Sequence, residues 1–140
     1  MKKIISLFLL LLAIESNAQS RDETAIRGIL DAQIKEWNRG DIVNFMKGYW
    51  QNDSLMFIGK SGITHGWNNT LKNYKKNYPD TTAMGKLSFT IIEVKKLSKE
   101  YYHVVGKWHL KRSIDNLDGH FTLLFRKVSG DWLIVADHSS

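Results

Sequence analysis

The sequence predicts an α+β domain in which a curved antiparallel sheet wraps around three N-terminal helices and encloses one small-molecule-sized pocket. Apolar residues recur at helical spacing in three segments before Pro79. From Gly85 onward, apolar and polar residues instead alternate with a period of two, as in half-buried strands. Short turn-like connections separate these alternating segments, which favours antiparallel neighbours.

The first residues have the pattern of a signal peptide. Two lysines precede an apolar run from Ile4 to Ile14, which is too short to span a bilayer, and Ala18 provides a small residue for cleavage. We therefore predict a signal peptide at residues 1–18 and one mature domain at residues 19–140. The domain would be exported to the periplasm or secreted, with no stable membrane insertion after cleavage. An uncleaved anchor and a buried N-terminal helix are the alternatives.

Composition limits the chemistry that the chain can perform. It has 140 residues and no cysteine, which excludes disulfides, thiol nucleophiles and cysteine metal sites. The net charge of +6 is modest and the lysines are scattered, so we predict no nucleic-acid partner. The five histidines lack the close spacing of metal ligands, and no glycine-rich phosphate loop occurs. We therefore predict no metal and no cofactor.

Three helices are predicted from apolar spacing and from residues that begin or end a helix. Gly40 ends the first helix, Asp41 caps the second, and Pro79 stops the third. Their apolar stripes are Ile26, Ile29, Leu30, Ile34 and Trp37; then Ile42, Phe45, Met46 and Tyr49; then Trp67, Leu71, Tyr74 and Tyr78.

A short strand at Leu55–Gly59, with Ile63 and Thr64 pairing back onto it, precedes four long strands. The long strands are predicted at residues 86–97, 101–113, 119–128 and 131–138.

Counting in twos along these strands assigns side chains to the two faces of the sheet. The count places His138 inward, on the face of Trp132 and Ile134, and turns Asp137 outward. It also places Glu93 on the inward face, although an exposed strand end would explain that residue equally well. The outer face keeps several apolar residues, so we predict a homodimer through it. These outer residues are Val105, Leu124, Leu133 and Val135.

A series of short motifs runs through the whole mature chain in a distinctive order. They are Trp37-Asn38-Arg39-Gly40-Asp41, Tyr49-Trp50, Gly66-Trp67, Tyr78-Pro79, Met84-Gly85, Gly106-x-Trp108, Phe121-Thr122-Leu123-Leu124-Phe125-Arg126 and the ending from Trp132 to Ser140. This series resembles the nuclear transport factor 2-like superfamily, a cystatin-like fold, and within it the DUF4440/SnoaL-like branch. The resemblance implies a cone-shaped α+β barrel, open at one end and commonly dimeric. It implies little about activity, because the fold hosts isomerases, cyclases, dehydratases and non-catalytic modules alike.

Nine residues are candidates for the pocket wall, because the concave sheet face and the inward helix faces would meet there. Such pockets are largely apolar with a few placed polar groups. The alternative is that these side chains fill the core. The candidates are Trp50, Phe57, Trp67, Tyr74, Met84, Phe89, Trp108, Phe121 and His138.

His138 is the candidate for chemistry, as a general acid or base near neutral pH. The alternative is a hydrogen-bonded histidine at the pocket rim that does no chemistry. The isomerase group of the fold uses a tyrosine from its first helix, and the stripe from Ile26 to Trp37 contains none.

Three functions remain open from the sequence. The first is an exported small-molecule-binding protein that is non-catalytic or weakly catalytic, with an apolar or aromatic ligand. The second is an isomerase, cyclase or dehydratase that uses His138. The third is a dimeric scaffolding module whose cone is filled by its own side chains.

Overall fold

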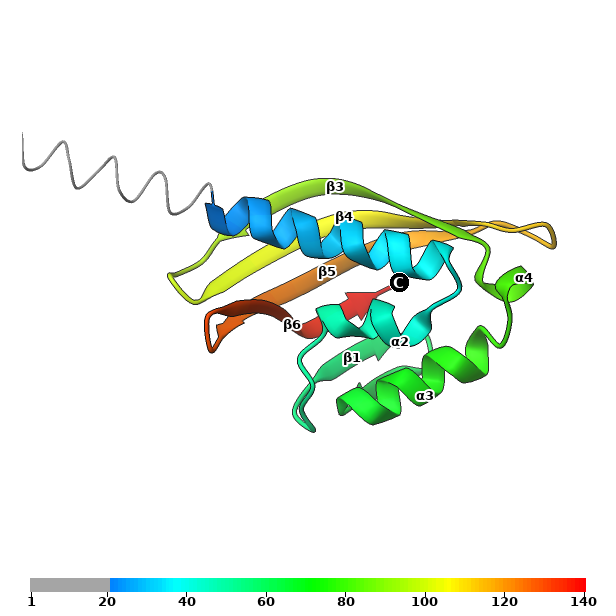
Figure 1. The fold of residues 1–140 in the computed structure, drawn as a ribbon, viewed down its shortest axis with the longest axis horizontal. Coiled ribbons are helices and arrows are strands. Elements are labelled where there is room, and N and C mark those ends of the chain that lie inside the picture. Colours follow the sequence, from blue (N-terminus) through cyan, green and yellow to red (C-terminus); the bar gives the residue numbers. More distant parts are fainter. Residues whose placement is uncertain (1–20) are drawn as a thin grey trace, which may run out of the picture.

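The structure, a computed structural model, describes residues 21–140, and the predicted signal peptide and its cleavage site lie outside them. Helices cover one face of a curved six-stranded sheet (Figure 1). The helical segments are the N-terminal helix (residues 21–38), α2 (Ile42–Phe45), η1 (Met46–Gly48), α3 (Trp67–Asn77) and α4 (Thr81–Met84). The strands are β1 (Met56–Gly59), β2 (Gly62–His65), β3 (Lys86–Lys96), β4 (Tyr101–Lys111), β5 (Leu117–Val128) and β6 (Asp131–Ser139). No helix in the described range is both long and apolar enough to cross a membrane.

The N-terminal helix follows its predicted stripe. Ile26, Leu30 and Trp37 are buried against the sheet, while Ile29 and Ile34 are half-buried beside them. Gly40 ends the turn with a φ of 83°, a left-handed conformation that glycine adopts without strain. The next helix starts at once because the Asp41 carboxylate accepts a hydrogen bond from the Asn44 backbone N–H at 2.9 Å.

The sheet has the order β2-β1-β6-β5-β4-β3. β3 to β6 form the predicted antiparallel meander, and β1 and β2 form the predicted short hairpin. β1 joins the meander by pairing parallel to β6. The α+β class and the curved, unclosed sheet are therefore confirmed. The short helix α4 was not predicted, and it begins where the Asp80 side chain accepts a bond from the Ala83 N–H at 2.8 Å.

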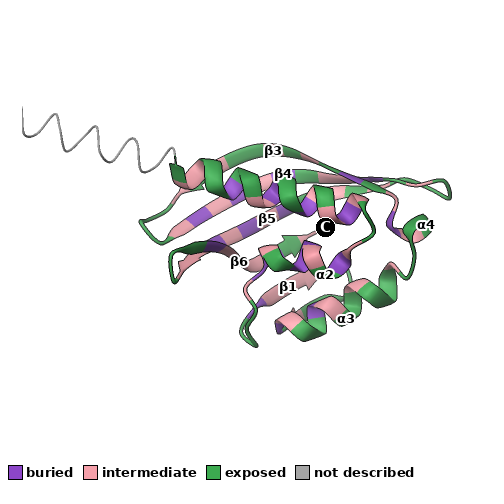
Figure 2. Ribbon diagram, in the orientation of Figure 1, coloured by how far each residue is buried: buried purple, intermediate pink, exposed green. Residues whose placement is uncertain are grey.

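One end of the inner sheet face is solidly packed. Tyr102, Val104, Phe125 and Ile134 are at most 1 % exposed there and belong to the same buried core as residues of the helical segments. Figure 2 shows buried positions along β4 and β5. Trp132 closes this end, and its indole N–H donates to Asp22 of the N-terminal helix at 3.0 Å. We call this region the packed end of the domain.

Two β-bulges change which side chains face inward. In β6, Ile134 pairs with Phe125 but Ala136 pairs with Leu124, so Val135 is an extra residue. Beyond this bulge the parity reverses, and Asp137 is buried whereas His138 is exposed. The predicted inward orientation of His138 and outward orientation of Asp137 are therefore wrong.

The second bulge lies in β3. Ile91 pairs with Gly106 and Glu93 with Val105, which leaves Ile92 as the extra residue. Val105 belongs to the outer face, so Glu93 points outward and is exposed. The inward alternative for Glu93 is wrong for the same reason as that for His138: alternation does not continue through a bulge.

Candidate functional site

A cavity of about 730 Å³ lies at the other end of the sheet, between the inner sheet face and the helices. Its volume falls within the roughly 300–1,000 Å³ typical of sites for small organic molecules. We call this region the hollow end. Its walls are rich in aromatic rings from the helical segments and the strands: Trp37, Phe45, Tyr49, Phe57, Tyr74, Tyr78, Phe89, Trp108 and Phe121.

The sheet wall of the cavity depends on two glycine–aromatic pairs across neighbouring strands. Gly106 of β4 lies opposite Phe121 of β5, and Gly119 of β5 lies opposite Trp108 of β4. A Cβ atom at Gly106 would approach the Phe121 ring to 2.4 Å, and one at Gly119 would approach the Trp108 indole nitrogen to 2.9 Å. Each ring therefore lies over the bare backbone of the partner strand. The glycines thus determine how the two aromatic walls are oriented.

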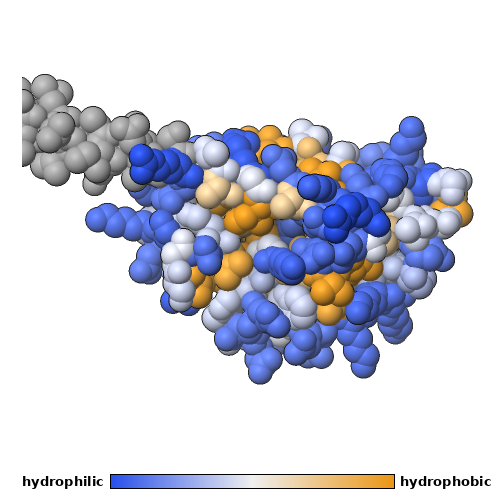
Figure 3. All heavy atoms as spheres, viewed as in Figure 1, coloured by the Kyte–Doolittle hydropathy of each residue, from blue (hydrophilic) through white to orange (hydrophobic). Residues whose placement is uncertain are grey.

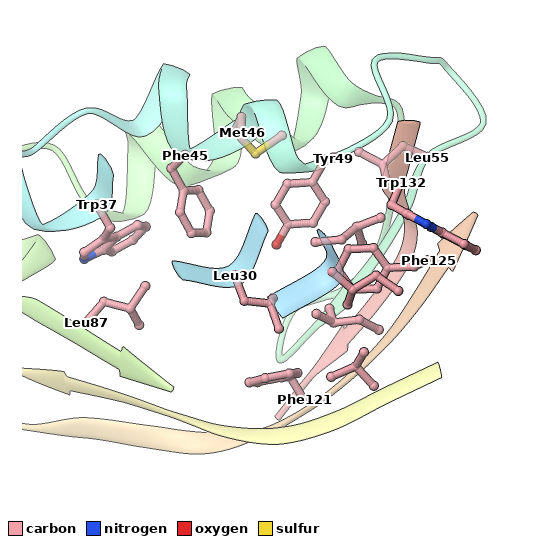
Figure 4. Close-up of a cluster of buried hydrophobic side chains, with 14 of the residues drawn as sticks. Leu30, Trp37, Phe45, Met46, Tyr49, Leu55, Leu87, Phe121, Phe125 and Trp132 are labelled. Atoms are coloured by element: carbon pink, nitrogen blue, oxygen red, sulfur yellow. The ribbon is translucent and has the colours of Figure 1, made fainter. Parts of the chain in front are cut away.

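The helix wall is organised around Tyr74 of α3. Its ring makes edge contacts with Trp37, Phe45 and Phe57 at centroid distances of 5.9, 5.3 and 5.6 Å. Figure 4 shows Phe45 and Tyr49 pointing from the α2–η1 segment toward the sheet that carries Phe121. The rings brace one another and hold the cavity open from this side.

The cavity contains one buried carboxylate, that of Asp137, which is only 4 % exposed. The Tyr49 hydroxyl donates to one carboxylate oxygen at 2.7 Å, and the Ser139 hydroxyl donates to the other at 2.7 Å. The Tyr74 hydroxyl lies 3.4 Å from that of Tyr49 and extends this chain of hydroxyls. Three hydroxyl groups, those of Tyr49, Tyr74 and Ser139, are therefore linked to this one buried acid.

Burial raises the pKa of Asp137 from its ordinary value of 3.8 to about 6. The hydrogen bonds from Tyr49 and Ser139 and the nearby charge of His138 lower that pKa but do not cancel the effect of burial. Burial, followed by the adjacent Asp137, also raises the pKa values of Tyr49 and Tyr74, so both stay protonated at neutral pH. Asp137 is thus the group in this network that exchanges a proton near neutrality.

The other polar side chains of the cavity are buried in its interior and exposed at its mouth. Gln33 of the N-terminal helix is buried and reaches the Phe45 carbonyl at 3.4 Å. Lys60, Asn73, Asn77 and Asp118 line the cavity but are exposed, so they form its polar mouth. The face shown in Figure 3 carries apolar side chains in patches among hydrophilic ones.

The structure brings together five of the nine predicted pocket residues. Trp50, Trp67 and Met84 lie outside the cavity: Met84 is buried in the core, and the Trp67 indole donates to the Met46 carbonyl at 2.9 Å. His138 lies on the outer face, opposite to Trp108, because of the bulge. The five that line the cavity are Phe57, Tyr74, Phe89, Trp108 and Phe121.

Sequence reasoning missed the polar centre of the site. Tyr49 was predicted on the inward stripe of a helix. It faces inward, but from extended backbone that follows η1 and bridges to Ile134, and it was not connected to the pocket. Asp137 was assigned to the wrong face. One signal was present: Asp137 directly follows the apolar run Leu133-Ile134-Val135-Ala136, where an ionisable residue is unusual. Among residues 21–140 no group of three potential ligands is arranged to hold a metal ion.

Solved structures with similar folds place the chain among known proteins. An NTF-2 like protein of unknown function from Shewanella oneidensis is 48 % identical, with a TM-score of 0.82, over 85 % of this chain and 98 % of that one. A Nostoc punctiforme domain of unknown function with a cystatin-like fold is 16 % identical, with a TM-score of 0.72, over 86 % and 76 % of the two chains. A ketosteroid isomerase-like protein from Erwinia carotovora is 19 % identical, with a TM-score of 0.64, over 84 % and 93 %. No family model and no curated protein matches the sequence.

The fold and its hollow end define the class of small α+β domains with one cavity between helices and a curved sheet. Because it is 48 % identical to the Shewanella protein over 85 % of its length, the chain belongs to the NTF2-like proteins. The resemblance to the superfamily is confirmed, while its DUF4440/SnoaL-like branch stays a prediction. The two more distant structures share the fold alone.

Proposed function

We propose that this protein, after export, binds a small and largely apolar molecule in the cavity of its hollow end. The observation that supports this most is the combination of a void of about 730 Å³ with aromatic walls and one buried carboxylate. Binding sites for small organic molecules have this composition, since apolar walls supply affinity and a few polar groups orient the ligand. A void of this size is the opposite of the filled cone that the scaffolding hypothesis requires.

Indole is a suitable first probe, because it is small, aromatic and neutral. We expect calorimetry to detect binding of indole to the wild-type protein and to a Leu97→Trp control, whose added ring lies at an exposed position between β3 and β4, outside the cavity. Leu117→Trp adds the same ring at the cavity wall and is expected to weaken binding at least about tenfold, because it occupies the void. Equal affinity in both variants would show that indole binds elsewhere.

A second candidate function is general acid–base catalysis by Asp137, and one observation favours it. A carboxylate with a pKa of about 6 in an apolar cavity is tuned for proton transfer near neutral pH. Tyr49 and Tyr74 stand beside it as hydrogen-bond donors. The acid–base role first predicted for His138 loses its support, because His138 does not face the cavity. Asp137 occupies the position that His138 was expected to occupy.

The acid–base function can be tested with 5-nitrobenzisoxazole, a generic substrate that opens when a base removes its ring C–H proton and its N–O bond breaks. We expect the rate to rise with pH and to level off above about pH 6, as Asp137 ionises. Asp137→Asn would abolish the acceleration, and Asp131→Asn, at an exposed position outside the cavity, would leave it unchanged. A rate that tracks only the concentration of hydroxide would exclude a catalytic base in the cavity.

A further inference from the structure

The Asp137 carboxylate has hydrogen-bond donors, but no described residue places a positive charge beside it inside the cavity. Both of its oxygens already accept short hydrogen bonds from neutral hydroxyls, those of Tyr49 and Ser139. Its neighbours across the sheet, Phe57 and Leu123, are uncharged. A buried carboxylate in such surroundings is unfavourable unless a cation accompanies it. Another neutral donor would repeat what is already there, so the missing element is a positive charge.

The described side chains do not supply that charge inside the cavity. Of the described residues that line it, Lys60 is the sole cation, and it is exposed in the turn between β1 and β2 at the mouth. The charge of His138 acts on Asp137 from the opposite face of β6, where the His138 side chain is exposed to solvent and lies outside the cavity. The residues that line the cavity from the described helical segments and from Tyr49 and Tyr78 are all uncharged, and their polar members are Gln33, Tyr49, Thr70, Asn73, Tyr74, Asn77 and Tyr78. A counter-charge therefore has to come from a molecule that enters the cavity.

The walls around this carboxylate suit an organic cation. Tyr49 supplies an aromatic ring and a hydroxyl directly at Asp137, while the rings of Tyr74 and Phe57 are in contact with each other at a centroid distance of 5.6 Å. An ammonium group held among aromatic rings is attracted to their faces, and more strongly where water is excluded. Beyond the carboxylate, Phe89, Trp108 and Phe121 offer apolar surface for the rest of the ligand.

We propose that the natural ligand of this cavity is a small hydrophobic amine, bound as its ammonium ion with the charged nitrogen at Asp137 and its apolar body against the wall formed by Phe89, Trp108 and Phe121. This inference rests on the proposed binding function and specifies the chemical class of the ligand.

The test compares three indoles of similar size: tryptamine, which is a cation, tryptophol, which is neutral but carries a hydroxyl, and indole-3-acetate, which is an anion. At pH 7.5 we expect tryptamine to bind at least about tenfold more tightly than tryptophol, and indole-3-acetate to bind most weakly. The advantage of tryptamine should shrink below about pH 6, where Asp137 becomes protonated while the amine stays charged. Calorimetry in two buffers should accordingly detect proton release on tryptamine binding near pH 6 and none at pH 8.

The matched variants are Asp137→Asn, which removes the buried charge, and Asp131→Asn, which removes an exposed charge from the start of the same strand, outside the cavity. Asp137→Asn should remove the preference for tryptamine and keep the affinity for tryptophol, whereas Asp131→Asn should keep both within about twofold. If Asp137→Asn does not fold, the pH series and the proton release of the wild-type protein decide alone.

The two levels of the proposal fail in different ways. If indole and tryptophol bind in the cavity but tryptamine binds no more tightly than tryptophol, the amine assignment is wrong and the binding function stands. If neither indole nor any of the three derivatives binds at millimolar concentration, both are wrong.

Discussion

The two ends of the same sheet are built differently, and β4 shows the change in one strand. At the packed end its inward residues are Tyr102 and Val104, both at most 1 % exposed. At the hollow end its inward residues are Trp108 and Leu110, which line a cavity. Gly106 lies between the two regions and gives the Phe121 ring room to lie over the strand.

The difference shows how one domain separates stability from binding. At the packed end, close apolar contacts hold the N-terminal helix on the sheet. At the hollow end, the aromatic rings contact one another and lie over glycines. β6 serves both regions, with Ile134 before its bulge and Asp137 after it. A single strand therefore carries a core residue and the polar centre of the site.

The sharpest contrast is expected from removing one ring at each end. Phe125→Ala should lower the free energy of unfolding by about 3–5 kcal/mol, because it opens a cavity in a fully packed region. Phe89→Ala should cost only about 1–2 kcal/mol, because one side of this half-buried ring already faces a void. Urea unfolding at pH 7 measures both values. Equal losses would contradict the division into packed and hollow ends.

Asp137 should make the hollow end sensitive to pH. Its folded-state pKa of about 6 exceeds the ordinary 3.8, so the folded protein holds this proton more tightly than the unfolded chain does. Stability should therefore fall as pH rises from about 4 to 6, by roughly 2–3 kcal/mol at most. Asp137→Asn should not lose stability in this way, so its free energy of unfolding should increase relative to that of the wild type over the same pH range. Unfolding curves from pH 4 to 8 test this, with Asp118→Asn as the control that should follow the wild type.

The glycine–aromatic pairs should be sensitive to a single added methyl group. Gly106→Ala would bring a Cβ within 2.4 Å of Phe121 and 2.9 Å of the Thr90 carbonyl, and should cost about 1–3 kcal/mol. Gly28→Ala is the matched control, since Gly28 is an exposed helical position with nothing within 4 Å. It should stabilise the protein by up to about 1 kcal/mol. Thermal unfolding separates the two outcomes, which should have opposite signs.

The smallest effect on folding is expected at the outer sheet face, where we expect a second subunit. Leu124, Leu133 and Val135 are half-buried there in the single chain. Leu124→Glu should leave unfolding nearly unchanged but separate a dimer into monomers. Light scattering of both proteins at micromolar concentration measures this, and a monomeric wild type would contradict the predicted homodimer.

The sequence predicted the architecture well because each signal was local. The first two helices could be predicted from neighbouring residues alone: the apolar stripe from Ile26 to Trp37, the helix end at Gly40 and the helix cap at Asp41. The long strands could be predicted from the alternation of apolar and polar residues. The site depends instead on register across strands. One extra residue at Val135 exchanged the positions of Asp137 and His138, and another at Ile92 turned Glu93 outward. Neither bulge carries a glycine or any other signal that marks it in the sequence.

The bulge at Val135 also has an evolutionary consequence. If the strand lost the bulge but kept all its residues, simple alternation would turn the imidazole of His138, instead of the carboxylate of Asp137, toward the interior. The reactive group of such a domain can thus be exchanged by gaining or losing a bulge, without altering the identity of any residue in the final Asp-His pair. Relatives that lack the bulge would be expected to recognise different molecules even when their remaining sequences are nearly the same.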